Sequence, residues 1–279
     1  MRVAVRLLAL LVLFAFPLSG SLAETKNGGD AKHEEAKPEE AKPQQAKPQE
    51  AKPDEKDKGA KERPFAVVVL GDSLSDGLWA SLYRGYIRAQ KQVSFKRYGI
   101  NSAGFTAHSF EDDFVKIAKD PVDLVIFMVG ANDRQRAFAM GTPREWAAFR
   151  TEKWHLIYRQ NIQRFLGLVQ EKKVPMVWVG MPIMRKEDAS EDAKMMNGIY
   201  RELATTHGAI FVDTWSITAN KDGEYDPYLE DDKGKKRRFR HDDGVHFTDF
   251  GYDHVTKHVL KVAREKLPQL QALWSVPGP

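Results

Sequence analysis

The chain contains no cysteine among its 279 residues. Disulfide scaffolds, thiolate zinc sites, cysteine nucleophiles and lipoprotein anchors are therefore excluded. A strong charge is also missing, because the formal net charge is only +4, and so mild a basic excess does not argue for a nucleic-acid partner. Long apolar runs are missing too. The run at residues 7–18 is about a dozen residues long, which is short for a membrane span.

That short apolar run has the flanks of a secretory signal. Arg2 and Arg6 give a positive start, and Ser21-Leu22-Ala23 offers small residues where a signal peptidase cleaves. We therefore predict a signal peptide over residues 1–23 that is cleaved after Ala23, with an uncleaved membrane anchor as the alternative. The prediction implies an exported protein, periplasmic or associated with the cell envelope.

Residues 24–63 are of low complexity. Copies of a five-residue unit that begins Ala-Lys-Pro start at positions 36, 41, 46 and 51. Such a segment cannot build a core, and its regular prolines block a continuous helix. We predict a disordered linker. It either gives the protein reach from the membrane or the cell wall, or acts only as a solubilising tail.

Residues 64–268 alternate between two patterns, and 269–279 form a predicted loose C-terminal tail. Apolar, strand-like segments are expected at 67–70, 93–98, 123–130, 174–180 and 209–213. Helical segments are expected at 81–90, 110–119, 145–173, 187–207 and 249–267, with a charged excursion over 219–240. Alternation of this kind predicts an α/β domain whose parallel sheet has helices on both faces.

A serine stands where the first predicted strand ends. Residues 65–70 are apolar and run directly into Gly71-Asp72-Ser73. Open α/β folds keep their active sites at the carboxyl ends of the strands, and the N–H at a helix start points toward a developing anion. Ser73 is therefore a candidate nucleophile. The competing interpretation is an Asp-Ser pair that only caps the helix.

Three further loops are expected at the same edge of the sheet. Gly104 allows a close backbone approach to a ligand, and Asn132 offers a neutral amide donor for an oxyanion. Asp243 and His246 are three residues apart, so the carboxylate can orient an imidazole that takes the proton of Ser73. The alternatives are a turn glycine, an Asx turn, and a surface histidine beside a capped helix.

Taken in this order, the four blocks resemble the SGNH (GDSL-like) hydrolases over residues 64–268. The resemblance implies a three-layer αβα, flavodoxin-like parallel sheet and a carboxylic ester hydrolase that needs no metal or organic cofactor. It also implies Ser73 as nucleophile, Asp243 and His246 as its partners, and an oxyanion hole made by Ser73, Gly104 and Asn132. The sequences at 129–135 and 243–248 are similar to a bacterial envelope subgroup known as domain of unknown function 459.

Neighbouring polar residues compete for roles in this site. Arg240 and Asp133 are weak candidates for substrate binding, although Asp133 and Arg134 are better explained by a local ion pair or a helix cap. Ser75 is a weaker candidate for the nucleophile, and His241 for the base.

The basic run at 233–240 has two interpretations. It could hold an anionic polymer near the site, or it could be a solvated loop that acidic residues at 226–232 neutralise.

The leading functional interpretation is an exported serine esterase that removes O-acetyl or other short acyl groups from envelope carbohydrate. Its expected partner is an ester or O-acetylated glycan substrate near the cell wall, and a monomer is expected. An O-acetyltransferase, a lipase and a thioesterase are alternatives on the same residues. A non-catalytic glycan-binding protein is a further alternative, but the intact set Ser73, Asp243 and His246 argues against it.

Overall fold

The computed structural model describes residues 63–86, 93–142 and 144–268. The predicted signal peptide, almost all of the predicted linker and the C-terminal tail lie outside these residues. None of the helices in the described ranges combines the length and the apolarity that a bilayer span requires.

The core of the fold is a five-stranded parallel sheet. It consists of β1 (Phe65–Gly71), β2 (Val93–Gly99), β3 (Leu124–Met128), β6 (Met176–Val179) and β7 (Ile210–Val212). Its strand order is β2-β1-β3-β6-β7, with every neighbouring pair parallel. This is the flavodoxin-like order, so the predicted fold class is confirmed.

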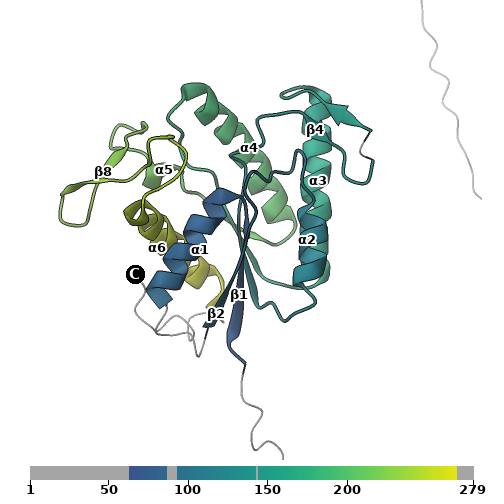
Figure 1. Cartoon of the computed structure of the whole chain (residues 1–279), viewed down its shortest axis with the longest axis horizontal. Coiled ribbons are helices and arrows are strands. Elements are labelled where there is room, and N and C mark those ends of the chain that lie inside the picture. Colours follow the sequence, from purple (N-terminus) through teal and green to yellow (C-terminus); the bar gives the residue numbers. More distant parts are fainter. Residues whose placement is uncertain (1–62, 87–92, 143, 269–279) are drawn as a thin grey trace, which may run out of the picture. The chain divides into compact units, whose positions relative to one another are not determined.

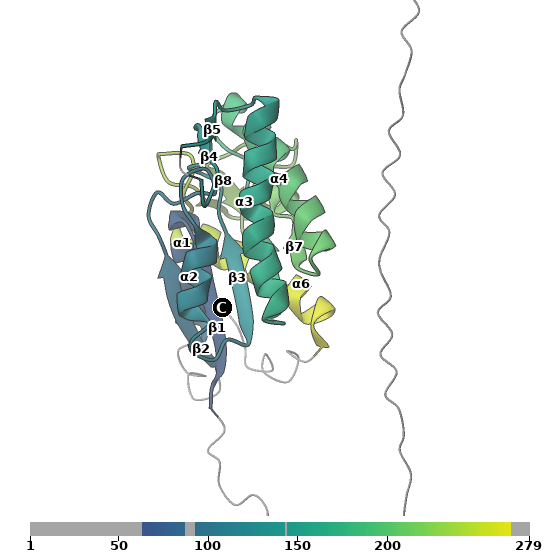
Figure 2. The ribbon, with the colours of Figure 1, turned by 90° about the vertical axis from the view of Figure 1, so that its right-hand side faces the viewer.

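Helices cover both faces of the sheet, which gives three layers (Figures 1 and 2). Helices α1 (Ser73–Tyr86) and α6 (Asp249–Lys266) pack on one face. Helices α2 (Phe110–Ile117), α3 (Glu152–Glu171) and α4 (Glu187–Thr206) pack on the other. The alternation along β1 decides the sides, because Val67 and Val69 face α1 and α6 while Val68 and Leu70 face the three remaining helices.

Two predicted helix starts are wrong. Helix α1 begins at Ser73 rather than at 81, because the carboxylate of Asp72 accepts the Leu74 N–H (2.9 Å) and so caps the helix. Helix α3 begins at Glu152 rather than at 145, where the side chain of Thr151 caps it. Arg150 has a left-handed φ of 65°, which a continuous helix does not tolerate.

Short elements fill the remaining connections. Strands β4 (Ala137–Phe138) and β5 (Trp146–Ala147) form an antiparallel pair before α3. A short helix, α5 (Trp215–Thr218), follows β7, and the charged excursion contains an antiparallel hairpin of β8 (Tyr228–Glu230) and β9 (Lys236–Arg238).

The basic run of this hairpin is partly neutralised by nearby carboxylates. Lys236 lies 3.8 Å from Asp226, and Arg238 pairs with Asp242. The contact between Lys236 and Asp226 agrees with the solvated-loop interpretation of the run, whereas Asp242 lies outside the acidic segment 226–232.

Candidate active site

Ser73 reaches the edge of the sheet through a tight turn after β1. Gly71 has a φ of 142°, and a Cβ on it would lie 1.8 Å from the carbonyl oxygen of Met128 in the neighbouring strand. Only glycine fits a backbone that approaches so closely. Ser73 then opens α1, beside the point where the strand order reverses between β1 and β3. Open α/β sheets bind their ligands at this crevice.

The side chains of Ser73, His246 and Asp243 form a hydrogen-bonded chain. Ser73 Oγ lies 2.8 Å from His246 Nε2, and His246 Nδ1 lies 2.7 Å from Asp243 Oδ2. A carboxylate accepts hydrogen bonds, so Nδ1 carries the ring proton and Nε2 is free to accept the proton of the serine. Ser73 is half-buried, and the side chain of His246 is 35% exposed, so a substrate can reach the pair from solvent.

Asp243 is held as an ionised carboxylate by its own loop. Its Oδ1 accepts the N–H groups of Val245 (2.8 Å) and His246 (2.9 Å), while Oδ2 accepts the ring N–H of His246. Burial acts to raise the pKa of Asp243, but these hydrogen bonds outweigh it and lower the pKa to about 2. The group that orients the imidazole is therefore charged throughout the neutral range.

Asp72 and Asn132 together join the three blocks that could stabilise an oxyanion. Asp72 is fully buried and accepts the N–H groups of Gly130 (3.2 Å) and Ala131 (3.3 Å) as well as that of Leu74. The side-chain amide of Asn132 donates to Asp72 (3.4 Å) and to the carbonyl of Ala103 (3.0 Å), the residue before Gly104.

These bonds bring the loops of Ser73, Gly104 and Asn132 together. The sequence reasoning missed this role of Asp72. The available signal was an acidic residue between a buried strand and the candidate nucleophile.

Asp133 is a support of the Gly104 loop, which corrects its prediction as a substrate-binding residue. It is fully buried, and its Oδ1 accepts the N–H (3.0 Å) and hydroxyl (2.9 Å) of Thr106, while its Oδ2 accepts the hydroxyl of Tyr158 (2.6 Å). A Cβ on Gly104 would lie 2.1 Å from Asp133 Oδ1, so the glycine is required for this packing. Burial raises the pKa of Asp133.

The sequence suggested a local ion pair between Arg134 and Asp133, but the two side chains do not pair. Arg134 binds Asp188 (2.6 Å) and Asp192 (2.7 Å) at the start of α4.

Arg240 is likewise buried, which corrects its prediction as a substrate-binding residue. It has no exposed surface, and its Nη2 donates to the carbonyls of Gly244 (3.2 Å) and Val245 (3.0 Å). The guanidinium lies 4.2 Å from the centre of the Phe247 ring. Burial lowers the pKa of Arg240 to about 10, so it stays charged at neutral pH beneath the loop of His246. Arg240 therefore holds this loop in place through its hydrogen bonds to the main-chain carbonyls.

The weaker candidates for nucleophile and base, Ser75 and His241, lie outside the hydrogen-bonded chain of Ser73, His246 and Asp243. Ser75 is fully buried, and its hydroxyl donates to the carbonyl of Asp72 (2.7 Å). His241 is exposed and has only main-chain contacts with the loop, through its N–H to the carbonyl of His246 (2.9 Å). Ser73 and His246 are the serine and histidine whose side chains meet.

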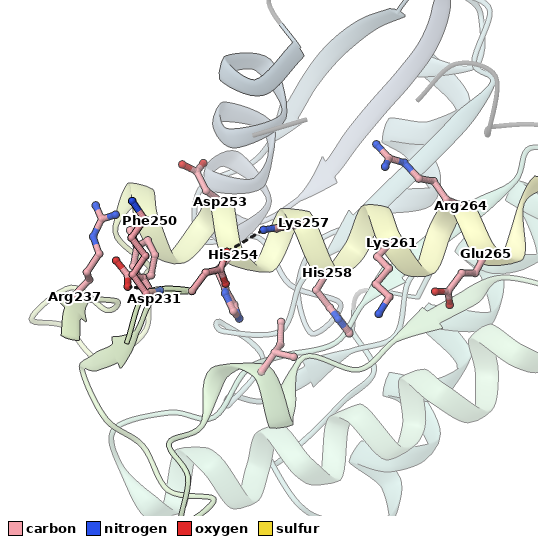
Figure 3. Close-up of a pocket in the computed structure, with 13 residues that line it drawn as sticks. Asp231, Arg237, Phe250, Asp253, His254, Lys257, His258, Lys261, Arg264 and Glu265 are labelled. Atoms are coloured by element: carbon pink, nitrogen blue, oxygen red, sulfur yellow. Dashed lines mark hydrogen bonds and ion pairs between the residues drawn. The ribbon is translucent and has the colours of Figure 1, made fainter. Parts of the chain in front are cut away.

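A cavity of about 880 Å³ lies along α6, away from Ser73 (Figure 3). It is lined by side chains of both charges, such as Lys257, Lys261 and Glu265, and by none of the residues that gather around Ser73. In the described part of the chain, no three acidic or histidine side chains are grouped as a metal site would require.

The pKa of Asp72 leads to a prediction about stability. Burial raises this pKa from 3.8 to about 7, so folding favours the protonated form. The stabilising contribution is complete below pH 3.8 and is lost as the pH rises through about 7. This loss amounts to roughly 4 kcal/mol of unfolding free energy. An Asp72→Asn variant lacks this pH dependence and its amide oxygen can still cap α1. Its NH₂ group cannot accept the N–H groups of Gly130 and Ala131, however, which costs about 1–3 kcal/mol.

We therefore expect wild type to be the more stable protein in mild acid, and the variant to overtake it above neutrality. Urea unfolding of both proteins across this range measures the difference. A stability difference that stays constant with pH would contradict the prediction.

Comparison with known proteins supplies the family. The model of the family described as protein of unknown function (DUF459) matches residues 66–262, which is most of the chain. No curated protein matches the sequence.

Solved structures share the fold at low sequence identity. A proposed acylhydrolase from Bacteroides fragilis is 18% identical with a TM-score of 0.51, over 74% of this chain and 92% of that one. A GDSL-like lipase from Bacteroides thetaiotaomicron is 17% identical with a TM-score of 0.50, over 74% and 93%. LAE5, an alpha/beta hydrolase enzyme from the metagenome of Lake Arreo in Spain, is 16% identical with a TM-score of 0.50, over 73% and 97%. The chain belongs to the DUF459 family, and its fold is that of the SGNH (GDSL-like) hydrolases.

Proposed function

We propose that the protein is a serine ester hydrolase. The observation that carries the proposal is the continuous chain from Ser73 Oγ through the imidazole of His246 to Asp243. A serine hydroxyl is a weak nucleophile on its own, and it is activated when a base within hydrogen-bond reach is oriented by a third group. Solved structures with this fold include proteins named as an acylhydrolase and a GDSL-like lipase.

The mechanism uses each of the three side chains in turn. His246 Nε2 takes the hydroxyl proton while Ser73 Oγ attacks the ester carbonyl. The imidazolium, stabilised by Asp243, then protonates the leaving alcohol, and the carbon–oxygen bond of the ester breaks. Water attacks the acyl-serine with His246 again as base. The acid is released, and Ser73 recovers its proton.

The oxyanion is held by donors that converge from three loops. The Ser73 N–H is the first of α1, and the first N–H groups of a helix have no partner within it. The N–H of Gly104 and the amide of Asn132 come from two further loops. The hydrogen bonds of Asn132 to Asp72 and to the carbonyl of Ala103 hold these loops beside Ser73. These donors would stabilise the negative charge that develops on the carbonyl oxygen.

The amide of Asn132 is expected to contribute strongly to this stabilisation by exchanging its long hydrogen bond to Asp72 (3.4 Å) for one to the oxyanion. Replacing Asn132 with alanine should lower kcat about 10²–10³-fold, the usual effect of losing one oxyanion donor. KM should change little, because the charge exists only in the transition state. Steady-state hydrolysis of an activated acetyl ester measures both constants. Gln135→Ala is the control, since its side-chain amide donates only to the carbonyl of Asn132 (2.9 Å). A kcat close to that of wild type would contradict the role of Asn132.

The favoured substrate is a short-chain ester on envelope carbohydrate. The cavity that borders Asp243 has a volume of about 290 Å³, just below the roughly 300–1,000 Å³ of sites for drug-sized ligands, so it suits a single small group of a substrate. The predicted signal peptide and linker agree with action outside the cytoplasm, near the wall.

Acetate release from O-acetylated cell-wall polysaccharide tests the proposal. We expect release by the full-length wild-type protein and none by Ser73→Ala, measured with an enzymatic acetate assay. A neutral hydroxyl-bearing acceptor added to the same reaction distinguishes transfer from hydrolysis. If wild type cleaves neither this material nor 4-nitrophenyl esters of any chain length, the proposed function is wrong.

A further inference from the structure

A second feature of the site is a small cavity next to the catalytic loop. It has a volume of about 290 Å³ and lies between the loops that follow β3 and β6 and the loop of Asp243. Met181, Met184 and Val245 are among the apolar residues that line it, and Arg134, Arg185 and Lys186 bring positive charge to it. Asp243 is the only carboxylate in its lining.

Two of these three cations are not neutralised. Arg134 is bound by Asp188 and Asp192, so it adds little net charge. Arg185 donates to the main-chain carbonyl of Asp242 and lies over the ring of Tyr225. Within the described ranges, neither Arg185 nor Lys186 has an acidic side chain at ion-pair distance.

The nearby carboxylates cancel only part of this charge. Asp188 feels the charge of Lys186, but its carboxylate is bound to Arg134. The carboxylate of Asp243 accepts a hydrogen bond from the neutral ring of His246, so it keeps its negative charge at the cavity wall. The lining therefore holds two cations that no carboxylate binds, Arg185 and Lys186, against the one charge of Asp243, and its net charge is positive.

A third cation lies behind the cavity wall. The guanidinium Nη2 of buried Arg240 is 3.8 Å from the sulfur of Met184, which lines the cavity. Its partners are carbonyl oxygens and aromatic rings, and Nε and Nη1 find no acceptor among the described residues. A buried charge is weakly screened, so its positive potential extends into the space in front of Met184.

The position of the cavity indicates which part of a substrate would occupy it. His246 must protonate the leaving oxygen, so the alcohol part of an ester lies against the loop that carries His246. Residues Asp243, Gly244 and Val245 of that same loop line the cavity. The alcohol part is therefore the part nearest to Arg185 and Lys186.

We propose that this cavity binds an anionic group, a carboxylate or a phosphate, on the alcohol part of the substrate. The preferred substrates would then be acyl esters of acidic molecules such as acidic sugars. This inference rests on the proposed ester hydrolase function and narrows its substrate class. Arg185 and Lys186 are the specificity-determining residues, and Arg240 supports them from behind the wall.

Acetyl esters of three nitrophenols that differ at one ring position test the proposal. The esters carry a carboxylate, a phosphate or an uncharged carboxamide at the same ring position, and release of the nitrophenol is followed by absorbance. The ratio of kcat/KM between an anionic ester and the carboxamide cancels effects common to all substrates. The two anionic arms distinguish a carboxylate site from a phosphate site.

Variants of Lys186 give the decisive comparison, because this exposed side chain makes no hydrogen bond or ion pair among the described residues. We expect wild type to prefer an anionic ester, and Lys186→Met to lower the ratio on the order of 3–5-fold, as for one exposed charge pair. Lys186→Glu should lower it further, and added salt should reduce the preference of wild type. Lys261→Met is the matched control, because Lys261 lines the separate cavity along α6 (Figure 3) and should leave the ratio unchanged.

The possible failures can be told apart. If wild type cleaves all three esters and the ratio is the same in Lys186→Glu as in wild type, the anionic subsite is wrong while the hydrolase function stands. If Lys261→Met lowers the ratio as much as Lys186→Met does, the effect is one of overall charge, and the subsite is again wrong. If wild type cleaves none of the three, the proposed function fails, and the inference fails with it.

Discussion

Replacing Ser73 with alanine is expected to lower kcat for ester hydrolysis about 10⁶-fold, the size of effect seen when the nucleophile of a serine hydrolase is removed. The hydroxyl is the atom that forms the acyl-enzyme, and no other described serine has its oxygen at a histidine nitrogen. The protein should remain folded. The Ser73 side chain is half-buried, its one hydrogen bond within the described ranges is to His246, and alanine is a favourable residue in the first turn of α1.

The measurement compares the hydrolysis of 4-nitrophenyl acetate by purified wild type and variant, with circular dichroism to verify the fold. Ser75→Ala is the matched control in the same turn. Ser75 donates its hydroxyl to the carbonyl of Asp72, so this variant is expected to lose some stability but to keep a serine that can be acylated. Substantial turnover by Ser73→Ala, or loss of turnover only in Ser75→Ala, would show that the nucleophile has been misassigned.

Replacing Asp243 with asparagine is expected to lower kcat about 10⁴-fold, although the two side chains have nearly the same shape. The main-chain N–H groups of Val245 and His246 both point at Oδ1, so the single amide oxygen of asparagine will take that position. Its NH₂ group then faces His246 Nδ1, where the ring must accept instead of donate. The ring proton moves to Nε2, and His246 can no longer take the proton of Ser73.

The pKa of about 2 for Asp243 makes this effect independent of pH across the neutral range, because the wild-type carboxylate is ionised throughout. A pH–rate profile of Asp243→Asn beside wild type measures the loss. Asp242→Asn is the control, since its side chain is 94% exposed and contacts Arg238 instead of the imidazole. A loss of tenfold or less in Asp243→Asn would mean that the carboxylate does not set the tautomer of His246.

The sequence alone was sufficient for the order of the main elements and for the fold class. Apolar segments that alternate with amphipathic ones leave little freedom, because a buried parallel sheet needs helices on both faces. The same rule explains why the loops of Ser73 and Asn132 could be expected at one edge of the sheet. The carboxyl ends of parallel strands all lie on that edge, whatever the strand order.

Local pattern was less informative about where helices begin. The start of α1 at Ser73 depends on the capping bond from Asp72, and the late start of α3 depends on the left-handed backbone at Arg150. Hydrophobic periodicity reports which face of a helix is buried, but a cap or one unusual φ angle decides its first residue.

Only the tertiary structure decided the roles of the charged residues. Asp133 directly follows Asn132, and Arg240 lies shortly before Asp243, so their place in the sequence favoured a substrate-binding role. In the structure both side chains are fully buried. Their partners are far away in the sequence or are main-chain carbonyls, such as Tyr158 for Asp133 and Gly244 for Arg240. A charged side chain can be buried only where packing brings it enough hydrogen-bond partners, and that packing is a property of the folded chain.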